Sequence, residues 1–172
     1  MSQHKFKTGL SVSGINKVIT ELTAYRDDLE RRSREIVKRL TDEGTVILRA
    51  EVVRLSIPDT GYLLSRCAGI YDAGANIGTV FCECDYAVFV EFGTGVKGQS
   101  SAYPGEAMAR AAYHYMGGTT YVILADGRIG WYYPADDGTW KFTEGMPSRP
   151  FMYNTAKQIR DMAVSAAREV FL

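Results

Sequence analysis

The triplet Asp59-Thr60-Gly61 is the pattern in this sequence that most directly suggests catalysis. Aspartic proteases present a carboxylate from such a turn and pair two of them, so that the pair shares one proton. The sequence has no second triplet, so a pair would need two copies of the chain. Pro58 and a long helical pattern precede the triplet, where those enzymes have an apolar strand. We therefore favour a structural turn in which Asp59 bonds its own backbone and Gly61 supplies a flexible dihedral.

The three cysteines could form a metal site. Cys82 and Cys84 would share one face of a strand and, with Cys67 and either His114 or Asp85, could surround a zinc ion. Structural zinc sites usually have two residues between paired cysteines, whereas this pair has one. We expect small, buried, free thiols in a reducing compartment instead.

Nucleophilic catalysis and nucleotide binding have little support in the sequence. The histidines are His4 and His114, and the base for a nucleophile would have to be His114, whose neighbours Tyr113 and Tyr115 indicate a helix face. The chain lacks a Gly-x-Ser-x-Gly motif, and Gly93–Gly98 lacks the residue order of a phosphate-binding loop. We expect no catalytic residue, no cofactor and no metal.

The composition excludes several classes of protein. Of the 172 residues, 46% are hydrophobic and 23% charged, values typical of a globular domain rather than a disordered or disulfide-rich chain. The 20 basic residues balance the 20 acidic ones, so no overall field favours nucleic acid or an anionic membrane. No apolar run approaches the ~20 residues that span a bilayer, and Met1–Thr8 leads into no signal core. We expect a single domain, 1–172, made in the cytoplasm.

One long helix is predicted over 13–56. Apolar residues recur at steps of three and four, Ser13 is available as the N-cap, and Pro58 forbids continuation. Gly44 could bend the helix, but the period continues beyond it. The apolar positions of the first part are Ile15, Val18, Ile19, Leu22, Tyr25, Leu29, Ile36, Val37 and Leu40. Such a helix exceeds what a domain of this size needs, so we expect part of its apolar side to contact another chain or layer.

Residues 62–146 are predicted to be mainly β. Tyr62–Tyr71 and Thr79–Cys84 form a hairpin around a glycine-containing loop. Asp126-Gly127 and Asp137-Gly138 each lie between apolar runs and predict two further hairpins.

The remaining segments are a loop and two helices. The stretch near 93–105, rich in glycine and serine without an apolar period, is predicted to be a mobile loop, and Glu106–Met116 a short helix. Residues 150–171 are predicted to form an amphipathic helix that packs across the sheet. The expected fold class is α+β: a long N-terminal helix, an antiparallel sheet built from hairpins, and a C-terminal helix packed on that sheet.

Three segments in fixed order carry a resemblance. They are Ile57–Ser65, which reads Ile-Pro-Asp-Thr-Gly-Tyr-Leu-Leu-Ser and is similar to the pattern Pro-x-Asp-Thr-Gly-x-Leu-x-x-Ser; Tyr86–Thr94, with Tyr-Ala-x-x-Val-Glu-Phe-Gly-Thr; and Pro150–Ala156, a Pro-Phe-hydrophobic motif with Gly130-Trp131-Tyr132 ahead of it. Together they resemble the tail-component family of tailed bacteriophages typified by gene product ten of a lambdoid coliphage. The second segment is the most specific. The resemblance places Asp59 in a structural signature, which argues against the protease hypothesis.

The resemblance implies a structural role and no enzymatic activity. It implies a virion structural protein of a phage or prophage that assembles in the host cytoplasm at the head-tail junction, as a neck or tail-completion subunit. Its implied partners are copies of itself, in a ring that we expect to be a hexamer rather than a dodecamer, and other head-tail connector or tail proteins. No small-molecule substrate, membrane or sequence-specific nucleic acid is implied.

Two departures and two alternatives accompany this interpretation. Residues 95–116 are longer than the usual linker after the Gly-Thr pair, and the hairpins at Asp126-Gly127 and Asp137-Gly138 also differ from the family pattern. One alternative is a small cytosolic enzyme that uses Asp59 or Cys84. The other is a prophage-derived module that binds a host protein.

Overall fold

The computed structural model describes residues 11–57, 60–101, 103–104, 121–135 and 137–171. Its elements are α1 (Val12–Arg54), α2 (Thr60–Ser65), β1 (Cys67–Asp72), β2 (Ile77–Cys82), α3 (Ala87–Phe92), α4 (Gly95–Ser100), β3 (Val122–Ile123), β4 (Ile129–Pro134), β5 (Trp140–Thr143) and α6 (Phe151–Phe171). The described strands form an antiparallel pair, β1–β2, and an antiparallel three-stranded sheet in the order β3–β4–β5. The predicted α+β class is confirmed. The helix predicted at Glu106–Met116 lies outside the described residues.

Helix α1 matches the predicted long helix within two residues at each end. It has 43 residues, which corresponds to about 65 Å at 1.5 Å per residue. Ser11 caps it by accepting a hydrogen bond from Gly14 N at 3.1 Å, so the prediction that Ser13 is the cap is wrong, and Ser13 lies in the first turn. Beyond the helix, Ser56 adopts a left-handed conformation, with φ of 47°, that redirects the chain.

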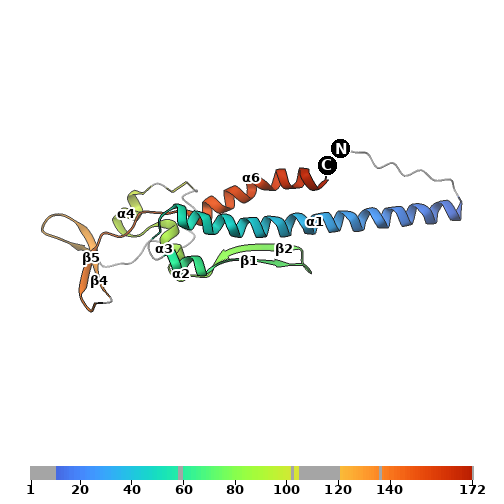
Figure 1. Cartoon of the computed structure of the whole chain (residues 1–172). Helices are drawn as coiled ribbons and strands as arrows, with labels where there is room; N and C mark the ends of the chain where they lie inside the picture. The colour runs from blue at the N-terminus through green and yellow to red at the C-terminus, as the bar shows by residue number, and fades with distance from the viewer. Residues whose placement is uncertain (1–10, 58–59, 102, 105–120, 136, 172) are drawn as a thin grey trace.

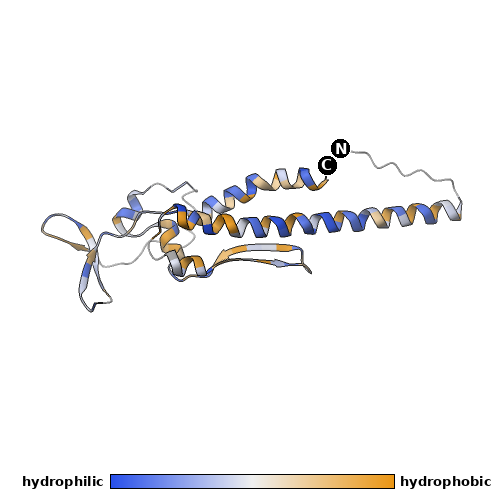
Figure 2. Cartoon of the chain, viewed as in Figure 1, coloured by the Kyte–Doolittle hydropathy of each residue, from blue (hydrophilic) through white to orange (hydrophobic). Residues whose placement is uncertain are grey.

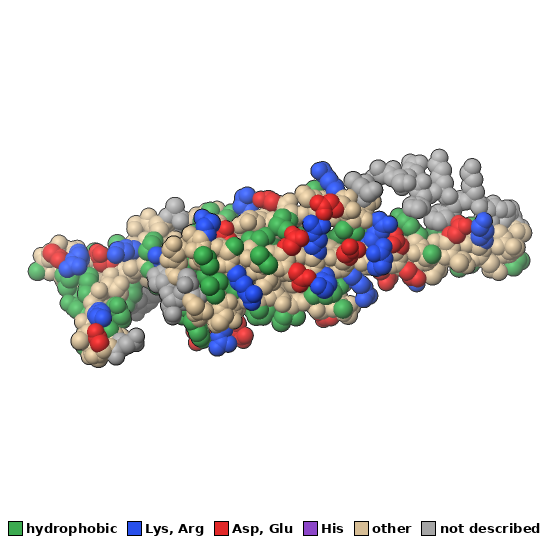
Figure 3. Space-filling model, viewed as in Figure 1, with side chains coloured by type: hydrophobic (Ala, Val, Ile, Leu, Met, Phe, Trp, Pro, Cys, Tyr) green, Lys and Arg blue, Asp and Glu red, His purple; other side chains and the backbone are tan. Residues whose placement is uncertain are grey.

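Charged side chains pair with one another along the exposed sides of α1. Lys38 lies 2.6 Å from Asp42 and Arg39 lies 2.7 Å from Glu43, each one helical turn apart. Figure 3 shows basic and acidic side chains interspersed along this helix. Exposed pairs of this kind contribute about 0.3–0.5 kcal/mol each, so they support the helix without fixing its place in the fold.

Helix α1 is the middle of three layers. Helix α6 runs along one side of it and the β1–β2 hairpin along the other (Figure 1). A Cβ atom added at Gly44 would lie 2.6 Å from Ile159 Cδ1 of α6 and 3.1 Å from Val80 Cγ2 of β2, so both layers close on α1 here. The predicted C-terminal helix is present as α6; it packs chiefly along α1, and at Gly44 its Ile159 approaches the same position as Val80 of the hairpin.

Both covering layers end at the same turn of α1. Arg32 Nη1 donates to Val170 O at 2.7 Å, at the end of α6, and Arg34 Nη1 donates to Ala73 O at 3.1 Å, in the hairpin turn. No other described helix or strand lies alongside α1 before this turn (Figure 1). We call the overhanging segment Val12–Arg31, about 30 Å long, the arm.

Small residues allow the hairpin to approach α1 closely. A Cβ atom added at Gly69 would overlap Thr45 Oγ1, and one added at Gly78 would overlap Thr41 Oγ1. The threonine hydroxyls donate to the carbonyls one turn earlier, Thr41 to Val37 O and Thr45 to Thr41 O, each at 2.8 Å. Their polar atoms are therefore satisfied within α1, and the hairpin packs against them without needing partners of its own.

The core lies where the C-terminal end of α1 meets α2, β1, α3 and the start of α6. Its buried residues are Leu48, Val52, Ile57, Leu63, Cys67, Val90 and Phe151. Figure 2 shows hydrophobic residues gathered at this end of α1 and on α2. The core thus joins segments from both halves of the chain.

The predicted hairpins are present, with shifted boundaries. The first strand begins at Cys67 rather than Tyr62, because Thr60–Ser65 forms α2, and the second covers Ile77–Cys82 rather than Thr79–Cys84. The segment 62–146 also contains α3 and α4, so it is less β-rich than predicted.

The β3–β4–β5 sheet forms the end of the molecule opposite the arm (Figure 1). Gly127 and Gly138 have φ values of 82° and 77°, as their hairpin turns require. The preceding aspartates accept backbone hydrogen bonds two residues on, Asp126 from Arg128 N and Asp137 from Thr139 N. The turn chemistry that predicted these two hairpins is therefore present in the structure.

Replacing Gly78 by alanine should destabilise the protein by about 1–3 kcal/mol, because the methyl group overlaps a threonine of α1 in a packed layer. Urea unfolding followed by circular dichroism measures the change. The matched control is Gly61→Ala in α2, where a Cβ atom meets nothing within 4 Å. That control should be neutral or stabilising by up to about 1 kcal/mol. Equal effects at both glycines would contradict the close packing of hairpin and helix.

Candidate functional site

Three residues singled out for catalysis, Asp59, His4 and His114, are not among those that the structure describes. Among the residues that the structure describes, no three His, Cys, Asp or Glu side chains are placed to hold a metal ion. Within the same residues, no helix combines the length and apolar character needed to cross a membrane.

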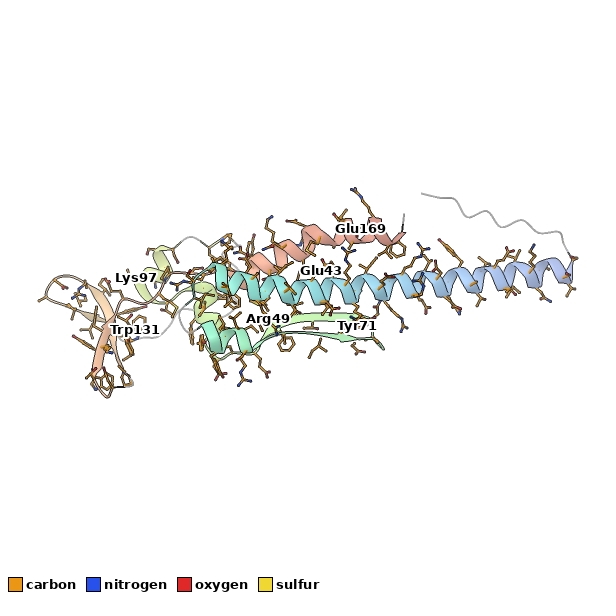
Figure 4. All side chains as sticks on the ribbon, viewed as in Figure 1. Glu43, Arg49, Tyr71, Lys97, Trp131 and Glu169 are labelled. Atoms are coloured by element: carbon orange, nitrogen blue, oxygen red, sulfur yellow. The ribbon has the colours of Figure 1, made fainter. Side chains whose placement is uncertain are left out.

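The structure brings two of the three cysteines together. Cys67 and Cys82 are directly opposite one another in the β1–β2 ladder, on the face that packs against α1. Cys84 lies two residues beyond β2 and packs against the same core. All three are free thiols, and Cys67 is fully buried. Arg49, labelled in Figure 4, donates from Nε and Nη2 to Cys67 O at 3.2 and 3.0 Å, which fixes the start of β1 to α1.

Part of the segment predicted to be a mobile loop is a short, docked helix. Helix α4 occupies Gly95–Ser100, and at the residue before it Thr94 N donates to Met146 O at 2.8 Å while Thr94 Oγ1 accepts from Met146 N at 3.0 Å. Residues 105–120 lie outside the described part. The loop prediction is therefore wrong for 95–100, because contacts with a distant segment hold a sequence that has no apolar period of its own.

Glycines make this docking close. Gly93 has φ of 77°, and a Cβ atom there would lie 2.5 Å from Ser148 N. Gly95 has φ of 60°, and a Cβ atom there would lie 2.6 Å from Trp131 Cζ3. Lys97 Nζ lies 3.7 Å from Glu144 Oε2, and Figure 4 shows Lys97 and Trp131 at the same end of the molecule. These contacts join α4 to the sheet β3–β4–β5.

A buried carboxylate, Glu91 of α3, holds the start of α6. Its Oε2 accepts a hydrogen bond from Met152 N at 2.9 Å, and its Oε1 accepts from Tyr153 N and from the Tyr103 hydroxyl, each at 3.0 Å. The side chain is 6% exposed. It supplies the oxygens that a helix N-terminus requires, from a residue about 60 positions earlier in the chain. Burial raises the pKa of Glu91 above its usual value, although these three hydrogen bonds oppose the shift.

The backbone around Glu91 is fastened to the same segment. Arg149 N donates to Val90 O at 2.9 Å, and the Ser148 hydroxyl donates to Glu91 O at 2.7 Å. Sequence reasoning quoted Glu91 within a motif but gave it no role. A usable signal was present: α6 has no acidic residue in its first turn, whereas Glu91 stands in an otherwise apolar run.

A second carboxylate, Glu51, joins the N-terminal part of α6 to α1. Its two oxygens accept hydrogen bonds from Arg54 Nε and Nη2 at 3.0 and 2.7 Å. They also accept hydrogen bonds from the side-chain amides of Asn154 and Gln158, each at 3.0 Å. The hydrogen bond from Arg54 is the largest influence that holds the pKa of Glu51 below its usual value. Sequence reasoning gave Glu51 no role, because its partners Asn154 and Gln158 lie more than 100 positions later in the chain.

The three segments that carry the family resemblance meet in one core. Leu63 of the first, Val90 of the second and Phe151 of the third belong to the same buried cluster. Glu91 and Thr94 use their hydrogen-bonding groups to hold the third segment and the residues just before it. Several motif residues therefore hold the scaffold together, whereas Tyr62 and Phe89 are each 44% exposed.

The larger exposed apolar surfaces lie toward the two ends of the molecule. One is the stripe along the arm formed by Ile15, Ile19, Leu22, Tyr25 and Leu29, which are 37–55% exposed. The other is the face of the terminal sheet that the register assigns to Val122, Tyr132, Pro134, Trp140 and Phe142. On it Trp140 is 68% and Tyr132 46% exposed. Apolar side chains exposed side by side are typical of protein interfaces.

Replacing Glu91 and Glu51 separately by glutamine should give opposite pH dependences of stability. Because the folded-state pKa of Glu91 is raised, its stabilisation relative to glutamine is fully present below the unfolded pKa of about 4.3 and is lost as pH rises through the folded pKa. Because the pKa of Glu51 is lowered, its stabilisation is present above about pH 4.3 and is lost as pH falls through the folded pKa.

The measurement is urea unfolding of the natural protein and both variants between about pH 3 and 7. At neutral pH the Glu51→Gln variant should lose roughly 1.5–3 kcal/mol, the usual value of a hydrogen bond to a charged group. Two variants whose stability differences change in the same direction with pH would refute the assignment.

Comparison with proteins of known family and structure gives no relative. No family model, no curated protein and no solved structure matches the chain. The function must therefore be inferred from the residues and their geometry.

Proposed function

We propose that the chain is a virion structural protein of a bacteriophage or prophage, acting as a neck or tail-completion subunit in a ring that joins tail to head. The observation that carries the proposal is that the three motifs of the resemblance pack against one another, with Leu63, Val90 and Phe151 in a shared core. A scaffold role explains why these residues occur together, and it needs no reactive group.

The distribution of surfaces supports a subunit with neighbours. A ring of identical subunits uses two different surfaces on each copy, one for each neighbour. The arm stripe and the face of the terminal sheet are two such surfaces at opposite ends of an elongated molecule (Figure 1). The arm extends beyond the layers that bury the rest of α1, which suits a contact made with another chain.

The alternatives predict different behaviour. A small enzyme acting through Asp59 or Cys84 would turn over a substrate without assembling. A module directed at a host protein would be missing from purified particles. Copy number in particles separates the proposed role from the host-directed module, and a turnover screen separates both from the enzyme.

Deleting this one gene from its phage or prophage should yield filled heads and separate tails in the lysate. The reason is that a junction subunit acts after heads and tails have formed independently. Electron microscopy of the lysate, with the gene restored from a plasmid as the control, makes the test. Normal infectious particles from the deletion strain would refute a role at the junction.

The double variant Ile19→Lys, Leu22→Lys should abolish ring assembly while leaving the subunit folded. Fully burying an Ile or Leu side chain contributes about 1.5–3 kcal/mol, and about half of each is still exposed here, so the two losses together should weaken each contact by roughly 10- to 100-fold. Both side chains are about half exposed, so the free energy of unfolding should change by little. Analytical ultracentrifugation measures the assembly.

The matched control for the arm variant is Val46→Lys. Val46 is also on α1 and is 68% exposed, but it lies outside the arm. The control should assemble as the natural protein does. Rings that persist in the double variant would show that the arm stripe is not a subunit contact.

A further inference from the structure

The base of the β1–β2 hairpin places two thiols in the geometry that a disulfide requires. Cys67 and Cys82 are register partners. Glu83 N donates to Arg66 O at 3.0 Å, which makes the adjacent pair, Arg66 and Glu83, the hydrogen-bonded type. Pairs alternate along an antiparallel ladder, so Cys67 and Cys82 form a non-hydrogen-bonded pair, whose Cα atoms lie about 4.5 Å apart. That separation falls within the range of about 4.4–6.8 Å found for disulfides.

The sulfur atoms also lie near one another. Cys67 Sγ is 3.2 Å and Cys82 Sγ 3.9 Å from the same acceptor, Leu63 O. Both side chains point to the face of the hairpin that meets α1. Cys84 is placed differently, because the register would set it opposite Ser65, which belongs to α2 and not to β1.

We propose that Cys67 and Cys82 are an oxidation site, at which a small-molecule disulfide such as oxidised glutathione converts the two thiols into an intramolecular disulfide across the hairpin. Cys82 is the entry point, because it is partly exposed whereas Cys67 is fully buried. The proposal does not depend on the assembly role and concerns the chain alone.

The chemistry balances in two exchanges. The Cys82 thiolate attacks one sulfur of oxidised glutathione, and the first glutathione leaves as a thiolate that takes up the proton from Cys82. The Cys67 thiolate then attacks Cys82 Sγ and expels the second glutathione, which takes up the proton from Cys67. The cysteine pair loses two electrons and two protons, and one molecule of oxidised glutathione becomes two molecules of reduced glutathione.

The two thiols have different surroundings. A hydrogen bond from Cys82 and the positive charge of Arg49 lower the pKa of the Cys67 thiol. Once Cys82 has reacted, its hydrogen bond to Cys67 is lost, and the positive charge of Arg49, held at Cys67 O, remains to oppose the effect of burial on the Cys67 pKa. The same thiol contact raises the pKa of Cys82, which should make the first exchange the slow one.

The consequence for the fold is local. The disulfide would close the chain from Cys67 to Cys82 into a covalent loop that contains the whole hairpin. The hairpin turn contacts α1 beside the base of the arm, through Ala73 and Arg34. Oxidation would therefore hold β1 and β2 together at the base of the hairpin and slow the separation of the two strands.

The test uses the full chain, reduced and then incubated with oxidised glutathione. The Cys84→Ser variant removes the third thiol, and we expect its final mass to be two hydrogen atoms lower, with no thiol left to titrate after denaturation. Two retained thiols, bound glutathione as the end product, or a disulfide between two copies would overturn the proposal.

Two further measurements keep the outcome independent of any one variant. In the natural protein, cleavage after Arg66, Tyr71 and Glu83 places the three cysteines on separate peptides, so mass spectrometry identifies the linked pair directly. A link that includes Cys84 would refute the assignment. The Cys67→Ser, Cys84→Ser variant, checked for folding by circular dichroism, should stop with one glutathione on Cys82, because the second nucleophile is absent. A Cys82 that stays unmodified there would refute its role as the entry point.

Discussion

The fold depends on one buried carboxyl group whose hydrogen bonds come from a distant helix. Removing a carboxylate from water is costly unless hydrogen bonds replace its hydration, and Glu91 obtains them from the first turn of α6 and from Tyr103. The helix in turn obtains the acceptor that its own first turn lacks. Neither half is well placed alone, so α3 and α6 must meet at this point. Once α6 starts there, Glu51 and the small residue Gly44 set its course along α1.

The close approach of the layers depends on residues that have a small side chain or none. Gly69 and Gly78 bring the hairpin against two threonines of α1, and Gly44 leaves room for side chains of both α6 and β2. Protein interiors are packed closely enough that an added methyl group is felt. The inner face of the hairpin is therefore held by close packing against α1. Ile70 and Ile77 lie on the outer face and are exposed to solvent.

The sequence predicts the elements whose signal is local and fails where partners are distant. α1 and α6 have long apolar periods, and the turns at Asp126-Gly127 and Asp137-Gly138 have their own chemistry, so all four were predictable. Helices α2, α3 and α4 have six residues each, too few to show a period. The cap provided by Glu91 and the pairing of Cys67 with Cys82 depend on register and docking between separated segments. Periodicity and turn motifs describe only neighbouring residues, so they do not contain that information.

The overhang of α1 places the arm in a helix–coil equilibrium of its own. An isolated helix of about 20 residues is marginal in water, chiefly because its first turn is costly to nucleate. The packed part of α1 acts as a permanent nucleus, so the arm needs only propagation. Gly14, Thr20 and Thr23 are weak helix formers, and the hydroxyls of Thr20 and Thr23 donate back to carbonyls one turn earlier. The arm should therefore melt progressively from Ser11 inward, and any surface that covers its apolar stripe would lengthen the helix as it binds.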